Sequence, residues 1–444
     1  MDMTQGTIWK QLIYFAFPLL IGNLFQQLYN TVDSVVVGNF VSTEALAAVG
    51  SVTPIINMLV GFFSGLATGA GVVISQFFGA KNGPMLHKAV HTTLLMTVGL
   101  GVIFTFIGIF MTPLMLNLMS TPADVFDGAA LYLRIYFGGV LGLMLYNMVS
   151  GILRAVGDSK RPLYFLILSS LLNVVLDLAF VLIFHWGIAG VAIATIIAQF
   201  ISAFLLLVVL ARSDEDYKLV LRDLKMDAEI LKRIVRIGLP AGLQMAVTSF
   251  SNVFVQSYIN RFGSACMAGW TSYSKIDQFV LLPMQSLSLS ATTFVGQNLG
   301  AGNLSRAKKG TRVSMAISVA ITAVLTVLLI AFSSQLLMLF NQDENVLYYG
   351  NIFIRYLAPF YVICCINQIF AGSLRGAGDA TGPMIIMLLS FVVFRQIYLF
   401  VGSQFFDSII FVGLGYPAGW LVCSVFMAIH YFRGRWEKDY QIAK

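Results

Sequence analysis

The chain has 444 residues, of which 58% are hydrophobic and only 11% are charged. Soluble globular domains contain roughly 25% charged residues, so this composition excludes an ordinary soluble domain and predicts an integral membrane protein. The net charge of +7 does not indicate nucleic-acid binding, because the lysines and arginines are spread along the chain between apolar segments.

Twelve apolar segments are predicted to cross the membrane as α-helices, because a helix satisfies its own backbone groups where no water is available. Six lie in each half of the chain, which predicts an all-α integral membrane fold. In chain order they are Ile13–Val37, Leu46–Ile74, Val90–Met111, Ala129–Leu153, Leu163–Phe184, Ile188–Leu210, Ile234–Tyr258, Ala268–Val295, Val313–Phe332, Gly350–Ser373, Pro383–Phe406 and Ser408–Phe432.

Lysines and arginines fall mainly in alternate connections between these segments. The positive-inside rule places those connections, and both termini with them, in the cytoplasm. We therefore expect a multi-pass protein of the plasma (cytoplasmic) membrane. The four cysteines have no metal-type spacing and are interpreted as packing residues: Cys266, Cys364, Cys365 and Cys423.

An internal repeat relates the two halves. Gly151–Pro162 and Gly372–Pro383 are identical at six of twelve positions, 221 residues apart, and the same offset aligns Arg134 with Arg355. Because each half holds an even number of helices, the two six-helix repeats are parallel and related by an axis along the membrane normal. Substrate is expected near the midplane between them, with access alternating between the two sides of the membrane.

The predicted organisation is an amino-terminal six-helix lobe at residues 1–211, a cytoplasmic linker at 212–232 and a carboxy-terminal six-helix lobe at 233–444. The linker mixes acids and bases with leucines and isoleucines at near-helical spacing, which predicts an interfacial or cytosolic helix. The Gly-Asp turns after Arg154 and Arg375 are expected to end one helix and begin the next.

Polar residues inside the first six segments indicate an ion site. A carboxylate in hydrocarbon needs a partner, a proton or a cation, so each is a candidate functional group. Helix direction and spacing place four polar residues at one depth: Asp33, Asn173, Asp177 and Thr195. Two carboxylates with an amide and a hydroxyl suit a hard monovalent cation such as sodium, and the same carboxylates also suit a shared proton.

A purely structural role for these residues is the alternative, in which the two aspartates only hydrogen-bond neighbouring backbone. The repeat argues against it, because the fold forms in the second half without them. The counterparts of the four residues there are apolar or aromatic. They are Val255, at the offset of 222 that aligns Pro18 with Pro240, and Phe394, Tyr398 and Tyr416 at the offset of 221.

The first segment also carries residues predicted to line a substrate cavity or to gate it. Gln26 and Asn30 belong to a polar stripe that ends at Asp33. Pro18 removes a backbone hydrogen bond and allows the helix to bend, so the stripe is expected to move when the carboxylates change state.

Three charged residues fall inside segments of the second half. Lys275 and Asp277 lie in the eighth segment and Arg395 lies in the eleventh. Either they neutralise one another, or they form a charged spot in the substrate path.

Several of these patterns resemble the MATE (multidrug and toxic compound extrusion) family over the whole chain. They are the proline and aspartate of the first helix, the Val-Gly-x-x-x-Ser run at Val37–Ser42, the Gly-Ala-x-Asn segments after helices two and eight, and the duplicated Leu-Arg-x-x-Gly-Asp turns. The resemblance implies twelve helices in two six-helix lobes of V-shaped arrangement. It also implies export of cationic or amphipathic compounds in exchange for sodium or protons.

The amino-lobe set of two aspartates, one asparagine and one threonine further resembles the cation site of the archaeal and DinF-type branch. Asn147 in the fourth helix resembles a polar position near that site. The chain departs from the NorM-type branch, which carries acids in helices seven and ten, because its tenth helix reads VICCINQ at Val362–Gln368.

The predicted function is secondary active efflux of drug-like cations, without a cofactor other than the coupling ion. An enzyme is set aside because no nucleophile with a base, metal cluster or phosphate loop has a plausible spacing. The alternative is a flippase for lipid-linked saccharides, although handling a pyrophosphate requires clustered cations. The expected partners are small-molecule cations and the lipid bilayer, without nucleic acid, and the chain is expected to be a monomer.

Overall fold

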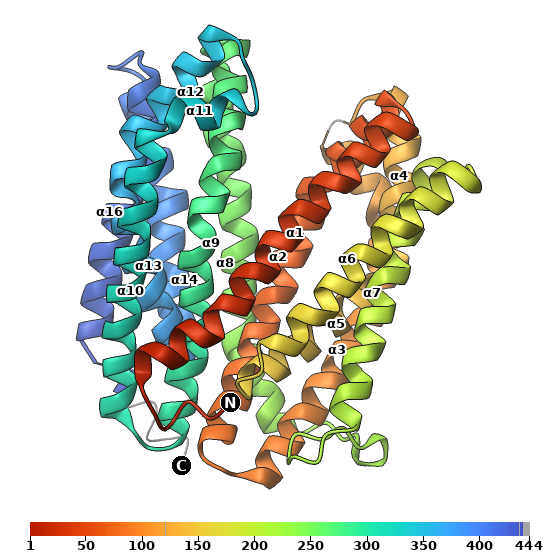
Figure 1. Cartoon of the computed structure of the whole chain (residues 1–444), viewed down its shortest axis with the longest axis vertical. Helices are drawn as coiled ribbons and strands as arrows, with labels where there is room; N and C mark the ends of the chain where they lie inside the picture. The colour runs from red at the N-terminus through yellow and green to blue at the C-terminus, as the bar shows by residue number, and fades with distance from the viewer. Residues whose placement is uncertain (120, 435, 438–444) are drawn as a thin grey trace. The chain divides into compact units, whose positions relative to one another are not determined.

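The computed structural model describes residues 1–119, 121–434 and 436–437, with side chains at all of them except 29–31, 33–35, 43, 249, 250 and 253. All regular secondary structure in this part of the chain is helical (Figure 1). The prediction of an all-α fold is therefore confirmed.

The first half contains seven α-helices and one π-helical turn before the linker, over the described residues. They are α1 (Ile8–Phe40), α2 (Thr43–Gly79), α3 (Gly83–Leu118), α4 (Ala123–Gly138), α5 (Val140–Ala155), α6 (Lys160–Leu178), η1 (Ala179–Ile183) and α7 (Gly187–Ala211).

The second half repeats this order, except that α11 and η3 are added and the counterpart of α6 is divided into α14, η4 and α15. Its helices are α8 (Ala228–Asn260), α9 (Ser264–Gly300), α10 (Leu304–Ala331), α11 (Ser333–Met338), α12 (Glu344–Leu357), η3 (Ala358–Phe360), α13 (Tyr361–Gly376), α14 (Thr381–Leu388), η4 (Leu389–Phe394), α15 (Arg395–Gly402) and α16 (Ile409–Phe432).

The helix boundaries confirm the internal repeat. The first residues of α2 and α9, Thr43 and Ser264, are 221 positions apart, and so are those of α5 and α13, Val140 and Tyr361. The sequence offset of the Leu-Arg-x-x-Gly-Asp turns is therefore the offset of the whole architecture.

Ten helical spans in the described part of the chain are long and apolar enough to cross a membrane, and α4 with α5, bent by 49°, forms an eleventh. The twelfth predicted crossing falls on α8, a helix of 33 residues that is not among these eleven. Large apolar side chains such as Phe110 and Leu118 are more than three-quarters exposed. Such a surface suits contact with lipid, since soluble proteins rarely expose it.

Contacts divide the chain into two compact units. The first consists of Met1 and Ile21–Gly238, and the second of Asp2–Leu20 and Leu239–Lys444. Helices α1 and α8 therefore each contribute residues to both units. In both helices the change of unit falls within three residues of an internal proline, Pro18 or Pro240.

Each unit has its own packed interior. In the first, α2 packs against α4 and α5, and α6 packs against α7. Gly69 on α2 lies so close to Gly238 on α8 that no side chain fits between the two backbones. In the second, α9 packs against α10, α12 and α13, around a core that includes Trp270 and Phe353.

The two Gly-Asp turns have the predicted role. Gly157 and Gly378 adopt φ angles of +85° and +97°, which favour glycine. The next residues, Asp158 and Asp379, accept hydrogen bonds from backbone N–H groups at the starts of α6 and α14. These turns are structural elements that end one helix and begin another.

The prediction of a helix between the two halves is wrong. Residues 212–227 are irregular apart from one 3-10 turn, η2 (Leu221–Asp223), and α8 begins only at Ala228. Asp227 caps α8, because its Oδ1 accepts the N–H groups of Glu229 and Ile230. The leucines and isoleucines that suggested one helix therefore belong partly to this loop and partly to α8.

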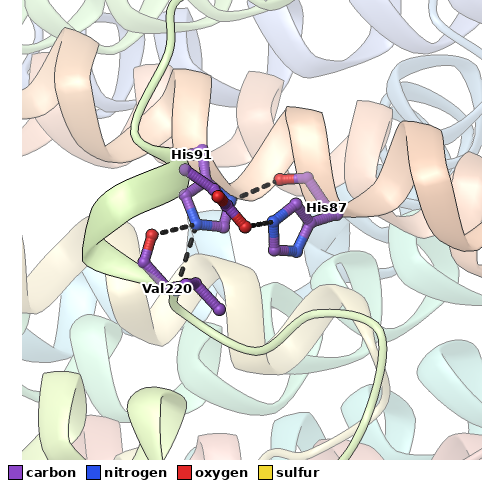
Figure 2. Close-up of polar contacts among 4 residues, drawn as sticks. His87, His91 and Val220 are labelled. Atoms are coloured by element: carbon purple, nitrogen blue, oxygen red, sulfur yellow. Dashed lines mark hydrogen bonds and ion pairs between the residues drawn. The ribbon is translucent and has the colours of Figure 1, made fainter.

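Two histidines on α3 hold the loop (Figure 2). His91 Nδ1 donates to the backbone carbonyl of His87 at 2.7 Å, and His91 Nε2 lies 3.1 Å from the backbone nitrogen and 3.0 Å from the carbonyl oxygen of Val220. His87 Nε2 also lies 3.3 Å from Asp223 Oδ2. These contacts use backbone groups that a helix would have paired internally.

Candidate ion-binding and substrate site

Helix α6 presents its polar side chains to the protein interior. Apart from Pro162, its buried residues are all polar: Ser169, Ser170, Asn173 and Asp177. The exposed residues Leu171 and Val175 lie on the opposite side. This inside-out arrangement is expected of a helix that faces lipid on one side and a polar site on the other.

The predicted neighbours on α6 and α7 meet in the structure. Asn173 Nδ2 donates to Thr195 Oγ1 at 3.4 Å, and Thr195 Oγ1 donates its own proton to the carbonyl of Val191 at 3.0 Å. Asp177 is fully buried one helical turn after Asn173. An amide, a hydroxyl and a carboxyl group therefore lie on the facing surfaces of two packed helices.

A π-helical turn follows this polar group directly. η1 begins at Ala179, two positions after Asp177, and takes the place of the last α-helical turn. π-helical turns inside α-helices are rare and frequently mark functional sites.

The structure describes only some of the predicted site residues on α1. The backbone of α1 is helical at Asn30 and Asp33, but both side chains lie outside the described residues. Gln26 is exposed, and Pro18 is buried in the part of α1 that belongs to the second unit. Asn147 on α5 donates its amide to the carbonyl of Leu143 in its own helix, at 2.9 Å.

Asp277 on α9 is held by two phenols in the second unit. Its Oδ1 accepts hydrogen bonds from Tyr273, at 3.3 Å, and from Tyr361 on α13. The two tyrosine hydroxyl oxygens are 3.0 Å apart, so the proton of Tyr273 is shared between Asp277 and Tyr361 as alternative acceptors. Tyr273 precedes Asp277 by four residues, a spacing that puts both on one helix face.

Arg395 is buried directly after the second π-helical turn, η4, and is only 3% exposed. Its Nη2 donates to Ser251 Oγ at 2.9 Å and to Asn252 Oδ1 at 2.8 Å, and its guanidinium carbon lies 4.7 Å from the ring centroid of Tyr416. Its Nε has no hydrogen-bond acceptor among the described residues. The guanidinium is thus held by neutral oxygens and an aromatic face.

Mutual neutralisation of the three second-half charges is not observed. Lys275 is exposed and lies over the ring of Phe340, with 5.7 Å between Nζ and the ring centroid. No ion pair within the described ranges joins Lys275, Asp277 and Arg395 to one another. Residues two positions apart on a helix differ in direction by about 200°, so the side chains of Lys275 and Asp277 lie on nearly opposite faces of α9.

Sequence reasoning missed the groups that hold these charges. Tyr361 and Ser251 are remote in sequence from Asp277 and Arg395, and only helix packing brings them together. The i, i+4 spacing of Tyr273 and Asp277 is a signal that was available. His91, which holds the linker, carried no such signal.

Comparison with known proteins identifies the family. Residues 18–179 and 240–401 both match the model of the MatE family, so the match covers most of the chain and falls once in each half. The chain belongs to the MatE family. Members of this family are transporters, which confirms both the resemblance to MATE proteins and the prediction that the chain is not an enzyme. The narrower likeness to the DinF-type branch remains a prediction.

Two relatives and one solved structure match the MatE chain along almost its full length. The probable multidrug resistance protein YoeA of Bacillus subtilis is 33% identical over 444 residues, 98% of this chain and 96% of YoeA. The probable multidrug resistance protein YpnP of the same organism is 30% identical over 438 residues, 98% of this chain and 97% of YpnP. A solved MOP superfamily transporter from Pyrococcus furiosus has a TM-score of 0.91 at 23% identity, covering 99% of this chain and 98% of that chain, which shows a common fold.

Proposed function

We propose that this MatE protein is a secondary active antiporter, which exports cationic or amphipathic small molecules in exchange for sodium ions or protons. Its relatives YoeA and YpnP are described as probable multidrug resistance proteins, and both match it from end to end. The duplicated helical architecture supports transport by alternating access, in which one repeat moves against the other.

The observation that carries this proposal is the buried polar group of Asn173, Asp177 and Thr195. An ion-driven transporter needs a site whose charge changes when an ion binds, and a carboxyl group in an apolar surrounding provides one. The corresponding positions of the second half are Phe394, Tyr398 and Tyr416. The fold itself therefore does not require a carboxyl group or an amide there.

The chemistry of the group suits either coupling ion. Sodium prefers several oxygen ligands, and the carboxylate, amide and hydroxyl oxygens would supply them together with the predicted ligand Asp33. A proton needs only a carboxyl group. The presence of the amide and the hydroxyl favours sodium, because a proton alone does not require them.

We further propose how ion binding reaches the substrate. The coupling ion enters from outside, occupies the site formed by Asp33 and Asp177, and changes the bend or the packing of α1 near Pro18. The affinity for drug in the cavity then falls on the outward side, and release of the ion inward completes the cycle. Gln26, Asn30 and Asn147 are assigned to the cavity or its gate.

The same proposal includes the setting of the transporter. The chain is a multi-pass protein of the plasma membrane with both termini in the cytoplasm, it acts as a monomer, and it uses no cofactor other than the coupling ion. Its two lobes comprise residues 1–211 and 233–444, joined by the cytoplasmic linker 212–232.

A flippase for lipid-linked saccharides remains the alternative. A pyrophosphate group would call for several cations in one place. Lys275 and Arg395 have no shared contact within the described residues, and Lys275 is exposed beside Phe340. This separation favours the antiporter.

Efflux of ethidium from drug-sensitive bacteria tests the proposal. Cells that express the wild-type chain should lose the dye several-fold faster than cells that express an equal amount of Asp177→Asn. The matched control is Asp127→Asn, an exposed aspartate on α4 of the same unit, which should export like the wild type. Equal efflux by Asp177→Asn would reduce Asp177 to a structural residue, and no efflux of any such dye by the wild type would favour the flippase.

A further inference from the structure

A second acidic group lies in the second unit, away from the group on α6 and α7, and its carboxyl group is partly buried. Asp277 accepts hydrogen bonds from Tyr273 on its own helix and from Tyr361 on α13. Both tyrosines are almost completely buried, at 2% and 0% exposure. Each phenol has one proton to donate: that of Tyr361 goes to Asp277, and that of Tyr273 goes to Asp277 or to the Tyr361 oxygen, so the phenols stabilise the carboxylate form of Asp277 without neutralising its charge.

No cation is paired with this carboxyl group among the described residues. The other titratable groups within electrostatic range on neighbouring helices are Cys364 on α13 and Tyr416 on α16. On α9 itself, Lys275 is exposed beside a phenylalanine ring. The helices α10, α11 and α12, which pack on α9, contribute no charged side chain in contact with Asp277 within the described ranges.

Arg395 forms no ion pair with Asp277 among the described residues. Its guanidinium lies over Tyr416 and donates to Ser251 and Asn252. Asp277 therefore has hydroxyl partners but no ion-pair partner. A partly buried carboxylate between two buried aromatic side chains, without an ion-pair partner, gains stability by binding a proton, because the neutral acid is less costly to remove from water.

The internal repeat shows that the fold does not need this network. At the offset of 221 residues, the counterparts in the first half are Val52 for Tyr273, Ile56 for Asp277 and Val140 for Tyr361. All three are aliphatic, and the corresponding helices α2 and α5 pack against each other without a polar contact at these positions. The hydrogen bonds among Asp277, Tyr273 and Tyr361 are thus present in the second half and have no counterpart in the first.

We propose that Asp277 is a proton-binding site of the second unit, formed with Tyr273 and Tyr361 and separate from the coupling site at Asp177. When a proton binds, an O–H bond forms on the carboxyl group and its negative charge is lost. The bond from Tyr361 then changes from a charge-assisted hydrogen bond to a weaker neutral one. Since Asp277 and Tyr361 stand on different helices, protonation weakens a contact between α9 and α13.

The binding step can be tested without any transport. Infrared difference spectra of the purified chain in lipid, recorded as the pH is lowered, should show a carbonyl-stretch band of a protonated carboxyl group. We expect Asp277→Asn to lose this band, and Asp177→Asn and Asp407→Asn, an exposed aspartate, to keep it. Tyr361→Phe should keep the band but shift it, because the carboxyl group loses one hydrogen bond.

Two results would overturn the inference. One is a spectrum of Asp277→Asn that retains every carboxyl band of the wild type. The other, which decides the matter if Asp277→Asn does not fold, is a Tyr361→Phe spectrum with all carboxyl bands at their wild-type positions.

The role of the proton in transport rests on the proposed function, and its test is separate. Asp277→Asn should flatten the dependence of dye efflux on external pH at least several-fold, whereas Asp407→Asn should leave it unchanged. A wild-type chain that shows the infrared band but exports no dye contradicts the proposed function and not the proton site. A chain that exports dye while Asp277→Asn leaves the spectra unchanged contradicts only the proton site.

Discussion

Thr195 illustrates how a polar side chain is fixed at an apolar helix interface. Its hydroxyl proton goes to the carbonyl of Val191 in the preceding turn, and its oxygen accepts the amide N–H of Asn173. A hydroxyl held in this way is an oriented acceptor. It needs little rearrangement to bind a cation.

Replacement of Thr195 by valine tests the sodium ligand. Valine has a similar size but no oxygen, so a sodium site would lose one ligand while the packing of α6 on α7 remains. We expect the sodium concentration that gives half-maximal dye efflux to rise about tenfold, which corresponds to about 1.4 kcal/mol of binding free energy. Thr195→Ser, which keeps the hydroxyl, should stay near the wild-type value, and an unchanged sodium dependence in Thr195→Val would exclude Thr195 as a ligand.

Arg395 shows a different way to keep a charge in the membrane. Guanidinium is planar and weakly hydrated, so it can lie on the ring of Tyr416 and still donate to Ser251 and Asn252. The absence of a carboxylate partner in the described part of the chain leaves its charge uncompensated. Buried charges of this kind are usually retained for function, because they are costly for stability.

At the scale of the helices, a π-helical turn lies next to Asp177 and another lies next to Arg395. η1 begins two residues after Asp177, and η4 ends immediately before Arg395. A π-helical turn interrupts the regular i→i+4 hydrogen bonding and leaves the helix easier to distort. In both units, a π-helical turn therefore lies beside a buried ionisable residue, Asp177 in the first and Arg395 in the second.

Helix α1 is the element expected to respond to ion binding. It leaves the second unit at Leu20, two residues after Pro18, and continues in the first. A proline in a helix removes one backbone hydrogen bond and favours a kink, so Pro18 provides a bend at the point where α1 changes unit. The corresponding change in α8 falls beside Pro240.

Replacement of Pro18 by alanine should slow efflux several-fold. Alanine restores the helical hydrogen bond, so the folded protein should be at least as abundant and as heat-resistant as the wild type while transport falls. Pro113→Ala in α3, a helix that lies wholly in the first unit, serves as the control in the same dye-efflux assay. Wild-type efflux by Pro18→Ala would show that a bend at this residue is not part of the cycle.

The linker depends on His91 for its position. In the neutral tautomer that donates Nδ1–H to the carbonyl of His87, Nε2 accepts the N–H of Val220. Removal of the ring should release the loop, because Val220 then has no partner on α3. Limited trypsin digestion of purified His91→Ala should cut after Arg222 or Lys225 several-fold faster than in the wild type. His185→Ala, an exposed histidine of the same unit, should be cut at the wild-type rate, and a similar rate for His91→Ala would mean that other contacts hold the loop.

At the scale of the whole molecule, the two repeats share a fold but differ in where they carry charge. The helix pair that holds Asn173, Asp177 and Thr195 in the first half corresponds to the pair that holds Arg395 and Tyr416 in the second. The second half has its hydrogen-bonded acid on α9 instead, at Asp277, which is partly buried. The two halves therefore share one arrangement of helices, and the residues that differ between them form different polar sites.

The fold was largely predictable because its signals are local and repeated. Apolar stretches of membrane length predict the helices, and the Leu-Arg-x-x-Gly-Asp turns reveal the duplication and its offset. The linker was predicted wrongly, because leucine spacing does not show that the ring of His91 competes for the backbone of Val220. The spacing of apolar side chains indicates where a helix is possible, but it does not reveal tertiary contacts that prevent the helix from forming.

Residues of the site were predictable from the sequence only where they are close together in the chain or are charged residues inside an apolar segment. Asn173 and Asp177 stand one turn apart, and the pairing of Asn173 with Thr195 followed from the depth of adjacent helices. The network of Asp277 and the surroundings of Arg395 required the packing of α13, α8 and α16, which no local pattern contains. The sequence indicates that charged residues inside apolar segments, such as Asp277 and Arg395, are candidate functional residues, but it does not reveal which residues contact them.

Ion-driven uptake of dye into proteoliposomes with an imposed gradient is the most direct measurement of coupling through the first unit. The wild-type chain should move ethidium against its concentration when a sodium or proton gradient is applied, and should stop when the gradient is collapsed. Asp177→Asn, reconstituted at the same density, should show no response to either gradient. Equal gradient-driven transport by Asp177→Asn and the wild type would contradict ion coupling at the Asn173, Asp177 and Thr195 group.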